Sequence, residues 1–186
     1  GTFNITGDNT PYLETYITFD CSSLTYIKQS NGQYNASINL TVIFKQGESI
    51  KNYDKYIVTS PQVSDTTNLD GFFMDIQRYS LPNGEYQMEV TIEDANNKKE
   101  RPFKVNETIV IDFPESICFS SIIALEDYKA STAESANSKN GYDLIPMIMP
   151  YYPESIDKVA YYTEIYNTKK QLGENEKYLL NTYIKT

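Results

Sequence analysis

Hydrophobic and polar residues alternate along several stretches of the chain, most clearly between Tyr34 and Phe44, where every second residue is apolar. This period of two is typical of a strand with one buried face. Further strand-like runs occupy residues 12–19, 24–28, 50–59, 72–79, 86–92 and 103–113. We expect the runs at 12–19, 24–28 and 34–44 to pair as neighbours. About seven strands without any sustained helical spacing predict an immunoglobulin-like antiparallel β-sandwich over residues 1–113.

The strongest local signal is the turn Leu81-Pro82-Asn83-Gly84, which is followed by strict alternation from Tyr86 to Ile92. Pro82 presets φ for the second position of a turn, and Asn83-Gly84 suits positive φ. We therefore assign structural turn roles to Pro82, Gly84 and Tyr86. Directly after a tight turn, Tyr86 is expected to bury its ring and return its hydroxyl to nearby backbone, as in a tyrosine corner. Contact with a ligand is the alternative role for this residue.

The pattern restarts after Pro114, which places a second β module at residues 114–186. Strand-like runs occupy residues 117–125, 142–149, 158–166 and 178–184, with a polar loop at 131–140, a turn at 171–174 and a short helix as an option at 154–160. About four strands is fewer than the roughly seven of a sandwich. We expect this module to be incomplete, so that either the natural chain continues past Thr186 or the small sheet packs against the first module.

Composition supports an all-β fold and restricts the partners. The aromatic residues are 17 Tyr and 8 Phe with no Trp, and tyrosine suits strands that are half buried. The formal net charge of -9 repels the phosphates of nucleic acid and the headgroups of anionic lipids. No apolar run is long enough to cross a membrane, so we expect no membrane insertion. Since the sequence starts at Gly1 without Met, we expect a secreted, periplasmic or cell-surface protein whose signal peptide has been removed.

Cys21 and Cys118 are the only cysteines and allow one disulfide at most. Neither lies in a metal-binding spacing. Two free, half-buried thiols are the favoured interpretation, and a bridge from the first strand to the junction between the modules is the alternative.

The side chains of most hydrolytic sites are missing. The sequence contains 0 His, which removes the usual general base and the commonest zinc ligand. It has no phosphate-binding glycine motif. We therefore expect no enzyme activity, no cofactor and no metal. The enzymatic alternative is a carboxylate pair among Asp65, Asp70 and Asp75. A calcium site formed by Asp65, Asp70 or the turn at Asp94 is a further alternative.

Tyrosines are dense in the second module and supply the candidate binding residues. Tyr151-Tyr152 and Tyr161-Tyr162 are adjacent pairs, so on strands each pair splits between opposite faces and leaves one ring outward. Outward tyrosines stack on sugars or anchor protein interfaces. Tyr151, Tyr152, Tyr161 and Tyr162 are thus the candidate ligand-binding residues, although ordinary core and surface roles also account for them.

Five segments of this chain resemble one group of exported proteins: the turn with its strand at 81–94 together with TFDCSSLTY, VIFKQG, KNGYDLIP and YTEIYN. The group comprises uncharacterised exported Bacteroides-type proteins with immunoglobulin-like or macroglobulin-type modules, some of which carry a GWxTD segment further on. No GWxTD segment is present here, so its activity is not transferred. The resemblance implies a non-catalytic binding or scaffold module with a protein or glycan partner in the cell envelope. A carbohydrate-binding module that uses its surface tyrosines is the alternative function.

Overall fold

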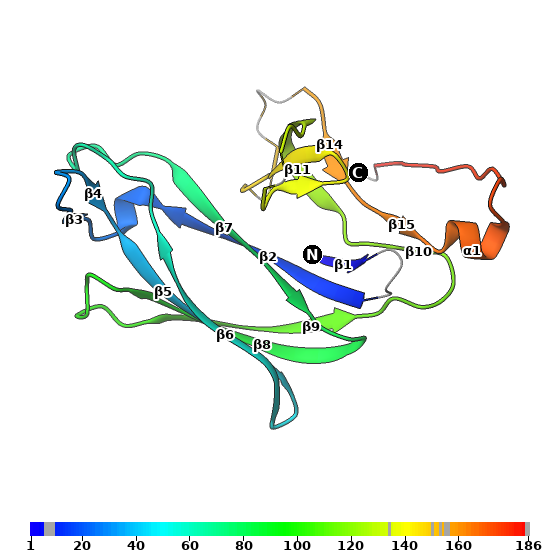
Figure 1. Cartoon of the computed structure of the whole chain (residues 1–186), viewed down its shortest axis with the longest axis horizontal. Helices are drawn as coiled ribbons and strands as arrows, with labels where there is room; N and C mark the ends of the chain where they lie inside the picture. The colour runs from blue at the N-terminus through cyan, green and yellow to red at the C-terminus, as the bar shows by residue number, and fades with distance from the viewer. Residues whose placement is uncertain (6–9, 134, 150, 153, 155–156, 185–186) are drawn as a thin grey trace.

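The computed structural model describes residues 1–5, 10–133, 135–149, 151–152, 154 and 157–184. The chain is 53% strand and 5% helix, and its strands pair antiparallel. The predicted class, an all-β antiparallel sandwich, is confirmed (Figure 1).

Two sheets form the first sandwich. The three-stranded sheet has the order β1–β2–β7, with β1 at Thr2–Ile5, β2 at Thr10–Asp20 and β7 at Phe72–Ser80. The four-stranded sheet has the order β6–β5–β8–β9 and comprises Ser49–Thr59, Ser37–Gln46, Gly84–Asp94 and Phe103–Ile111. A short ladder of β3 (Ile27–Lys28) and β4 (Tyr34–Asn35) lies at one end, after the 3₁₀ helix η1 (Cys21–Ser23).

The core between the two sheets follows from the alternation. Along β5 every second residue is buried, which directs Leu40, Val42 and Phe44 inward. The Phe44 ring lies 4.9 Å from the ring of Tyr79 on the facing sheet. Each such side chain contributes about 1.5–3 kcal/mol by leaving water. Burial of these residues therefore holds the two sheets together.

The turn before β8 has the expected corner. Tyr86 is 3% exposed and its hydroxyl donates to the Pro82 carbonyl at 2.9 Å. The Asn83 side chain exchanges two hydrogen bonds with the backbone of Phe113, at 3.0 and 3.1 Å. The turn therefore also fastens the segment where the chain leaves the first sandwich.

The second module is a small sheet that packs on the first. Its strands have the order β12–β13–β11–β14 and comprise Ser138–Lys139, Tyr142–Pro146, Ile123–Ala130 and Ala160–Tyr162. Its core joins Ile123, Leu125 and Leu144 to Phe3 of β1, with Tyr12 and Tyr16 of β2 packed against them. Of the two expectations for this module, packing against the first is the one that the structure shows.

The chain enters the second module through β10 (Cys118–Phe119) and leaves it through β15 (Ile165–Tyr166). These two strands pair with each other. Tyr166 belongs to the core of the first sandwich, where its ring lies edge-on to Phe113 at 5.4 Å. The helix α1 (Thr168–Leu172) follows, and residues 176–184 contain no helix or strand. The two cores therefore exchange residues across the Pro114 boundary, because Phe3 lies in the second core and Tyr166 in the first.

Several sequence predictions for individual elements were wrong. β2 pairs with β1 and β7 instead of with the runs at 24–28 and 34–44. The run at 34–44 is divided at Ala36, whose N–H donates to the Ser60 hydroxyl at 2.9 Å instead of joining a ladder. The turn expected at 171–174 begins inside α1, and the loop at 131–140 contains β12. The optional helix at 154–160 falls partly outside the described residues, and its described residues 157–159 are not helical.

Both cysteines are free thiols, with Cys21 in η1 and Cys118 on β10. In the described part of the chain no helix is long and apolar enough to cross a membrane.

Candidate functional site

One hollow of the second module is lined by tyrosines. Its volume is about 540 Å³. The lining comprises Leu125, Tyr128, Asn140, Tyr142, Leu144, Lys158, Val159, Ala160, Tyr161 and Tyr162. Apolar and aromatic side chains dominate, with few polar groups at the rim, which is the usual character of a binding site.

Strand register explains why Leu125, Tyr128, Leu144, Ala160 and Tyr162 share a face, whereas Tyr161 lies opposite Ala124 and belongs to the other face. Tyr128 lies opposite Leu144, and Leu125 lies opposite both Pro146 and Ala160. Leu125 and Tyr128 are three residues apart and would point to opposite faces of a regular strand. A bulge between Leu125 and Asp127 restores them to the same face. The irregularity in β11 therefore adds Tyr128 to the lining.

Two tyrosines in the hollow remain largely open to solvent. Tyr128 is 56% exposed and Tyr142 is 48% exposed, and their rings meet edge to face at 6.2 Å. The turn between β12 and β13 positions Tyr142, because Asn140 and Gly141 have φ values of 47° and 83°. Two consecutive positive φ angles give the tight hairpin that Asn-Gly favours.

The four predicted tyrosines have different environments. Tyr161 and Tyr162 both line the hollow. Tyr162 also packs against Phe3, and its hydroxyl accepts from Asn140 at 2.6 Å. Tyr152 donates its hydroxyl to the Ala160 carbonyl at 3.0 Å, and Tyr151 is 61% exposed outside the lining. The structure thus brings together Tyr161 and Tyr162 with Tyr128 and Tyr142, which the sequence reasoning did not select.

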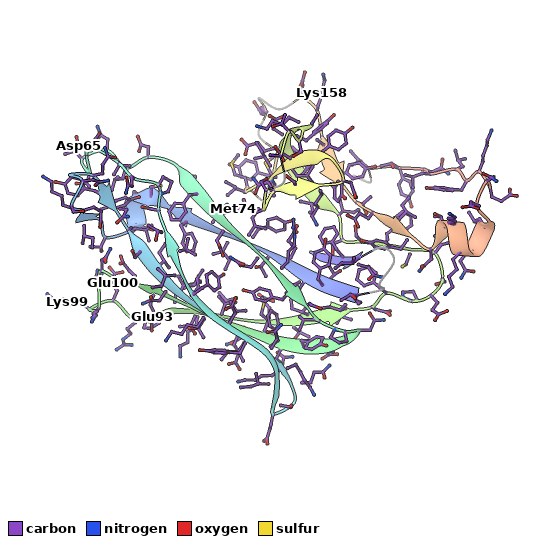
Figure 2. All side chains as sticks on the ribbon, in the orientation of Figure 1. Asp65, Met74, Glu93, Lys99, Glu100 and Lys158 are labelled. Carbon is purple, nitrogen blue, oxygen red and sulfur yellow. The ribbon has the colours of Figure 1, made fainter. Side chains whose placement is uncertain are left out.

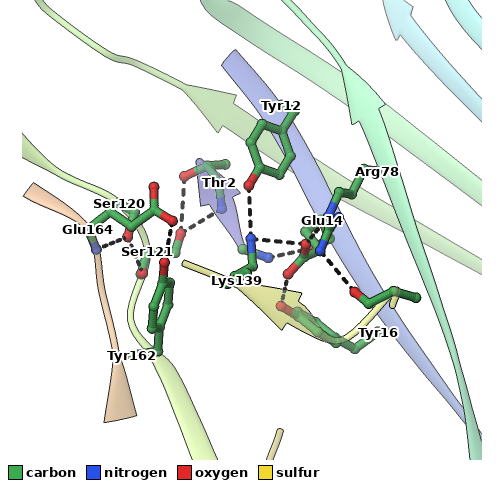
Figure 3. A network of polar contacts seen from close by, with 12 residues as sticks. Thr2, Tyr12, Glu14, Tyr16, Arg78, Ser120, Ser121, Lys139, Tyr162 and Glu164 are labelled. Carbon is green, nitrogen blue, oxygen red and sulfur yellow. Dashed lines mark hydrogen bonds and ion pairs between the residues drawn. The ribbon is translucent and has the colours of Figure 1, made fainter. Parts of the chain in front are cut away.

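A buried ion cluster holds the second module in place (Figure 3). Glu14, on the outer face of β2, has a side chain that is 1% exposed. Its Oε2 lies 2.5 Å from Arg78 Nε and 3.1 Å from Lys139 Nζ, and its Oε1 accepts from the Tyr16 hydroxyl. Arg78 Nη2 also donates to the Ala136 carbonyl at 2.9 Å. Residues of β2 and β7 therefore bind the β12 region of the second module directly.

Lys139 is the second-module member of this cluster. Its ammonium lies 3.7 Å from the centroid of the Phe3 ring and donates to the Tyr12 hydroxyl at 2.8 Å. An ammonium held over an aromatic face and paired with a carboxylate recovers part of its lost hydration.

The protonation of the cluster follows from its burial. Burial by itself raises the pKa of Glu14, but the hydrogen bonds from Tyr16 and Arg78 and the charge of Lys139 outweigh it and hold this pKa below its ordinary value. Burial lowers the pKa of Lys139, and the charge of Glu14 opposes that shift. We conclude that Glu14 is ionised at neutral pH.

A second polar group secures the other side of the junction. Glu164 accepts from the hydroxyls of Tyr162 and Tyr166. The Tyr166 hydroxyl in turn accepts from the Asn4 N–H at 3.0 Å. Burial, followed by the hydrogen bond to Glu164, raises the pKa of Tyr166 above its ordinary range, so this phenol stays neutral. Glu164 therefore links Tyr162 of the hollow to Tyr166 in the core of the first sandwich.

The carboxylates of the enzymatic alternative have separate partners. Asp65 is exposed and accepts from Thr67, whereas Asp75 accepts from the Tyr56 hydroxyl at 2.7 Å and from Gln77. Figure 2 shows Asp65 at the far end of the first sandwich, away from Lys158 at the hollow. Within the described residues no group of three or more His, Cys, Asp or Glu is placed to hold a metal ion.

We find no match to a family model, to a curated protein or to a solved structure.

Proposed function

We propose that the protein is a non-catalytic interaction module of the cell envelope, and that the tyrosine hollow is its docking surface for an extended apolar segment of a partner protein. The observation that carries this proposal is the exposure of Tyr128 and Tyr142 in a hollow with an apolar lining. Aromatic residues of this kind are enriched among those that dominate binding energy at protein interfaces.

The edge of the sheet favours an extended partner. Among the residues that the structure describes, β14 is the last strand of its sheet and pairs only with β11. An added strand gains main-chain hydrogen bonds at such an edge, while its alternate side chains enter the neighbouring hollow. The ion cluster at Glu14 supports this role, because contacts that hold the second module on the first would reduce the entropy lost on binding.

Carbohydrate binding is the second candidate, because the polar groups of Asn140 and Tyr162 lie beside the tyrosine rings. Sugars use this combination of ring faces and hydrogen-bonding groups.

Parallel screens of the whole chain against a peptide library and a glycan array separate the two candidates. We expect apolar peptide ligands whose affinity falls at least about tenfold in Tyr142→Ala and in Tyr161→Ala. Tyr53→Ala is the matched control, because Tyr53 is 54% exposed on β6 of the first sandwich. Glycan ligands with the same sensitivity would favour the second candidate. Ligands that bind all of these variants equally would refute the docking surface.

A further inference from the structure

An apolar cleft opens between the two sheets of the first sandwich, beside β2. On the side of β2 away from β7, β1 pairs with Thr10–Leu13 only, and in the described part of the chain no strand lies along residues 15–20. The cleft follows Leu13–Thr18 and has a volume of about 520 Å³. This volume falls within the roughly 300–1,000 Å³ of small-molecule sites, so the cleft is large enough for a ligand.

The wall of the cleft that the four-stranded sheet forms is apolar. It includes Val90 and Ile92 of β8 and, paired with them across the sheet, Val105 and Phe103 of β9. At the end of this wall the Phe103 side chain is 64% exposed. An apolar wall that stays partly open to solvent gains free energy when an apolar ligand covers it. The wall therefore suits the hydrocarbon part of a ligand.

The facing wall, on β2, carries a hydroxyl without a partner. Leu13, Thr15 and Ile17 point toward the first core, because side chains alternate along the strand. The Thr15 Oγ1 is buried and has no hydrogen-bond partner among the described residues. Buried polar groups are nearly always hydrogen-bonded. A ligand in the cleft that carries an oxygen at this depth would supply the bond that the chain does not.

Cations gather at the end of the cleft next to Phe103. The turn at residues 95–102 joins β8 to β9 and carries three cationic side chains and one carboxylate: Lys98, Lys99, Arg101 and Glu100. All four are exposed, and none forms an ion pair with a described residue (Figure 2). The chain as a whole has a formal net charge of -9, but salt screens exposed charges beyond about 8–10 Å. This basic turn therefore attracts an anionic group locally.

We propose that the cleft binds a long-chain anionic amphiphile, with its alkyl chain between the sheets, its acidic headgroup at the basic turn and an oxygen of its chain at Thr15. The basic turn lies at the Thr18 end of β2, because the Thr25 N–H, shortly after β2, donates to Asp94 at the end of β8 at 2.8 Å. Thr15 is three residues, or about 10 Å, further along β2. The oxygen that it would contact therefore belongs near the middle of the alkyl chain.

Two matched ligands and two matched variants test the contact at Thr15. Oleate and ricinoleate differ only in a hydroxyl near the middle of the chain, and each is titrated into the full chain by calorimetry below its critical micelle concentration. We expect ricinoleate to bind about fivefold more tightly, and Thr15→Val to remove this difference. Thr91→Val should leave it unchanged, because Thr91 lies between Val90 and Ile92 and points to the outer face of β8. Equal affinities of the two ligands for the wild type would overturn the proposal.

Charge variants and vesicles test the place of the headgroup. Lys98→Gln combined with Lys99→Gln should weaken oleate binding about fivefold and leave the binding of oleyl alcohol unchanged. The matched control is Lys51→Gln combined with Lys55→Gln, which removes the same charge from exposed positions of β6. Equal losses in the two double variants would overturn the proposal. Binding to phosphatidylglycerol vesicles without binding of free oleate would assign the basic turn to a membrane surface and also overturn it, as would binding of neither.

Discussion

Replacing Glu14 by Gln should destabilise the protein far more than the loss of an ordinary surface ion pair. The change keeps the shape of the side chain but removes the charge that faces Lys139, whose side chain is 6% exposed and 3.1 Å away. The Arg78 side chain is 40% exposed and can turn to water. The Lys139 side chain is buried and cannot turn to water in this way. A buried charge without its partner lowers the free energy of unfolding by about 3–5 kcal/mol. We therefore expect the free energy of unfolding to fall by about that amount.

A double-mutant cycle with Lys139→Met separates the ion pair from the general effect of substitution. Removing both charges should cost less than the sum of the two single changes, with a coupling energy of about 2 kcal/mol. Glu89→Gln is the matched control, because Glu89 and Lys45 form a pair at 2.6 Å with side chains 39% and 30% exposed. Such exposed pairs contribute less than about 1 kcal/mol.

The measurement is urea unfolding followed by far-UV circular dichroism and tyrosine fluorescence, since the chain has no Trp. Hydrogen exchange at β12 and β13 would locate the loss at the junction. The reasoning is refuted if Glu14→Gln costs no more than Glu89→Gln, or if the two changes in the cycle add without coupling.

Three further predictions concern other parts of the fold. Tyr86→Phe should cost about 1 kcal/mol in urea unfolding, because it leaves the Pro82 carbonyl without the 2.9 Å hydrogen bond, and an unchanged midpoint would contradict the corner. Phe3→Ala should cost about 3–5 kcal/mol and speed hydrogen exchange in β11 and β13 but not in β5, and uniform exchange would contradict its place in the second core. The pKa of Glu14 is lower in the folded state than its ordinary 4.5, so its contribution is present above that pH and is lost as the pH falls through the folded value. Wild type should therefore lose more stability than Glu14→Gln on acidification from about pH 5 to about pH 3, and parallel losses would contradict the ionised cluster.

The sequence predicted elements whose structure is determined locally. The turn at Pro82 and the alternation after Tyr86 specify β8, because turn chemistry and side-chain period act over a few residues. The segment at 178–184 was wrongly predicted as a strand, because apolar residues alone do not form a strand unless they pair with another part of the chain. The four residues of β1 gave no periodic signal, and their place is fixed by pairing with β2.

The sequence did not reveal the contacts between the two modules or the place of Tyr128 and Tyr142 in the hollow. Both depend on residues that are far apart in the chain. Glu14 lies on the face of β2 that points away from the first core, where an exposed polar residue is expected. It is buried because the second module packs over this face. Its neighbours Tyr12 and Tyr16 on the same face were the available signal, because large rings on both faces indicate a strand covered on both sides. Asn140-Gly141 likewise marks a hairpin that brings Tyr142 into the sheet. No comparable residue pattern predicts the bulge that directs Tyr128 into the hollow.

The anchoring of Tyr166 determines how the protein responds to mechanical load. A pull on the C-terminal segment passes through α1 to β15, where the pairing with β10 and the Tyr166 ring against Phe113 carry it into the first sandwich. The sheet that bears the tyrosine hollow precedes β15 in the chain, and Glu164 accepts from both Tyr162 of the hollow and Tyr166 of β15. A pull on the C-terminal segment would therefore reach the hollow as well as the first sandwich.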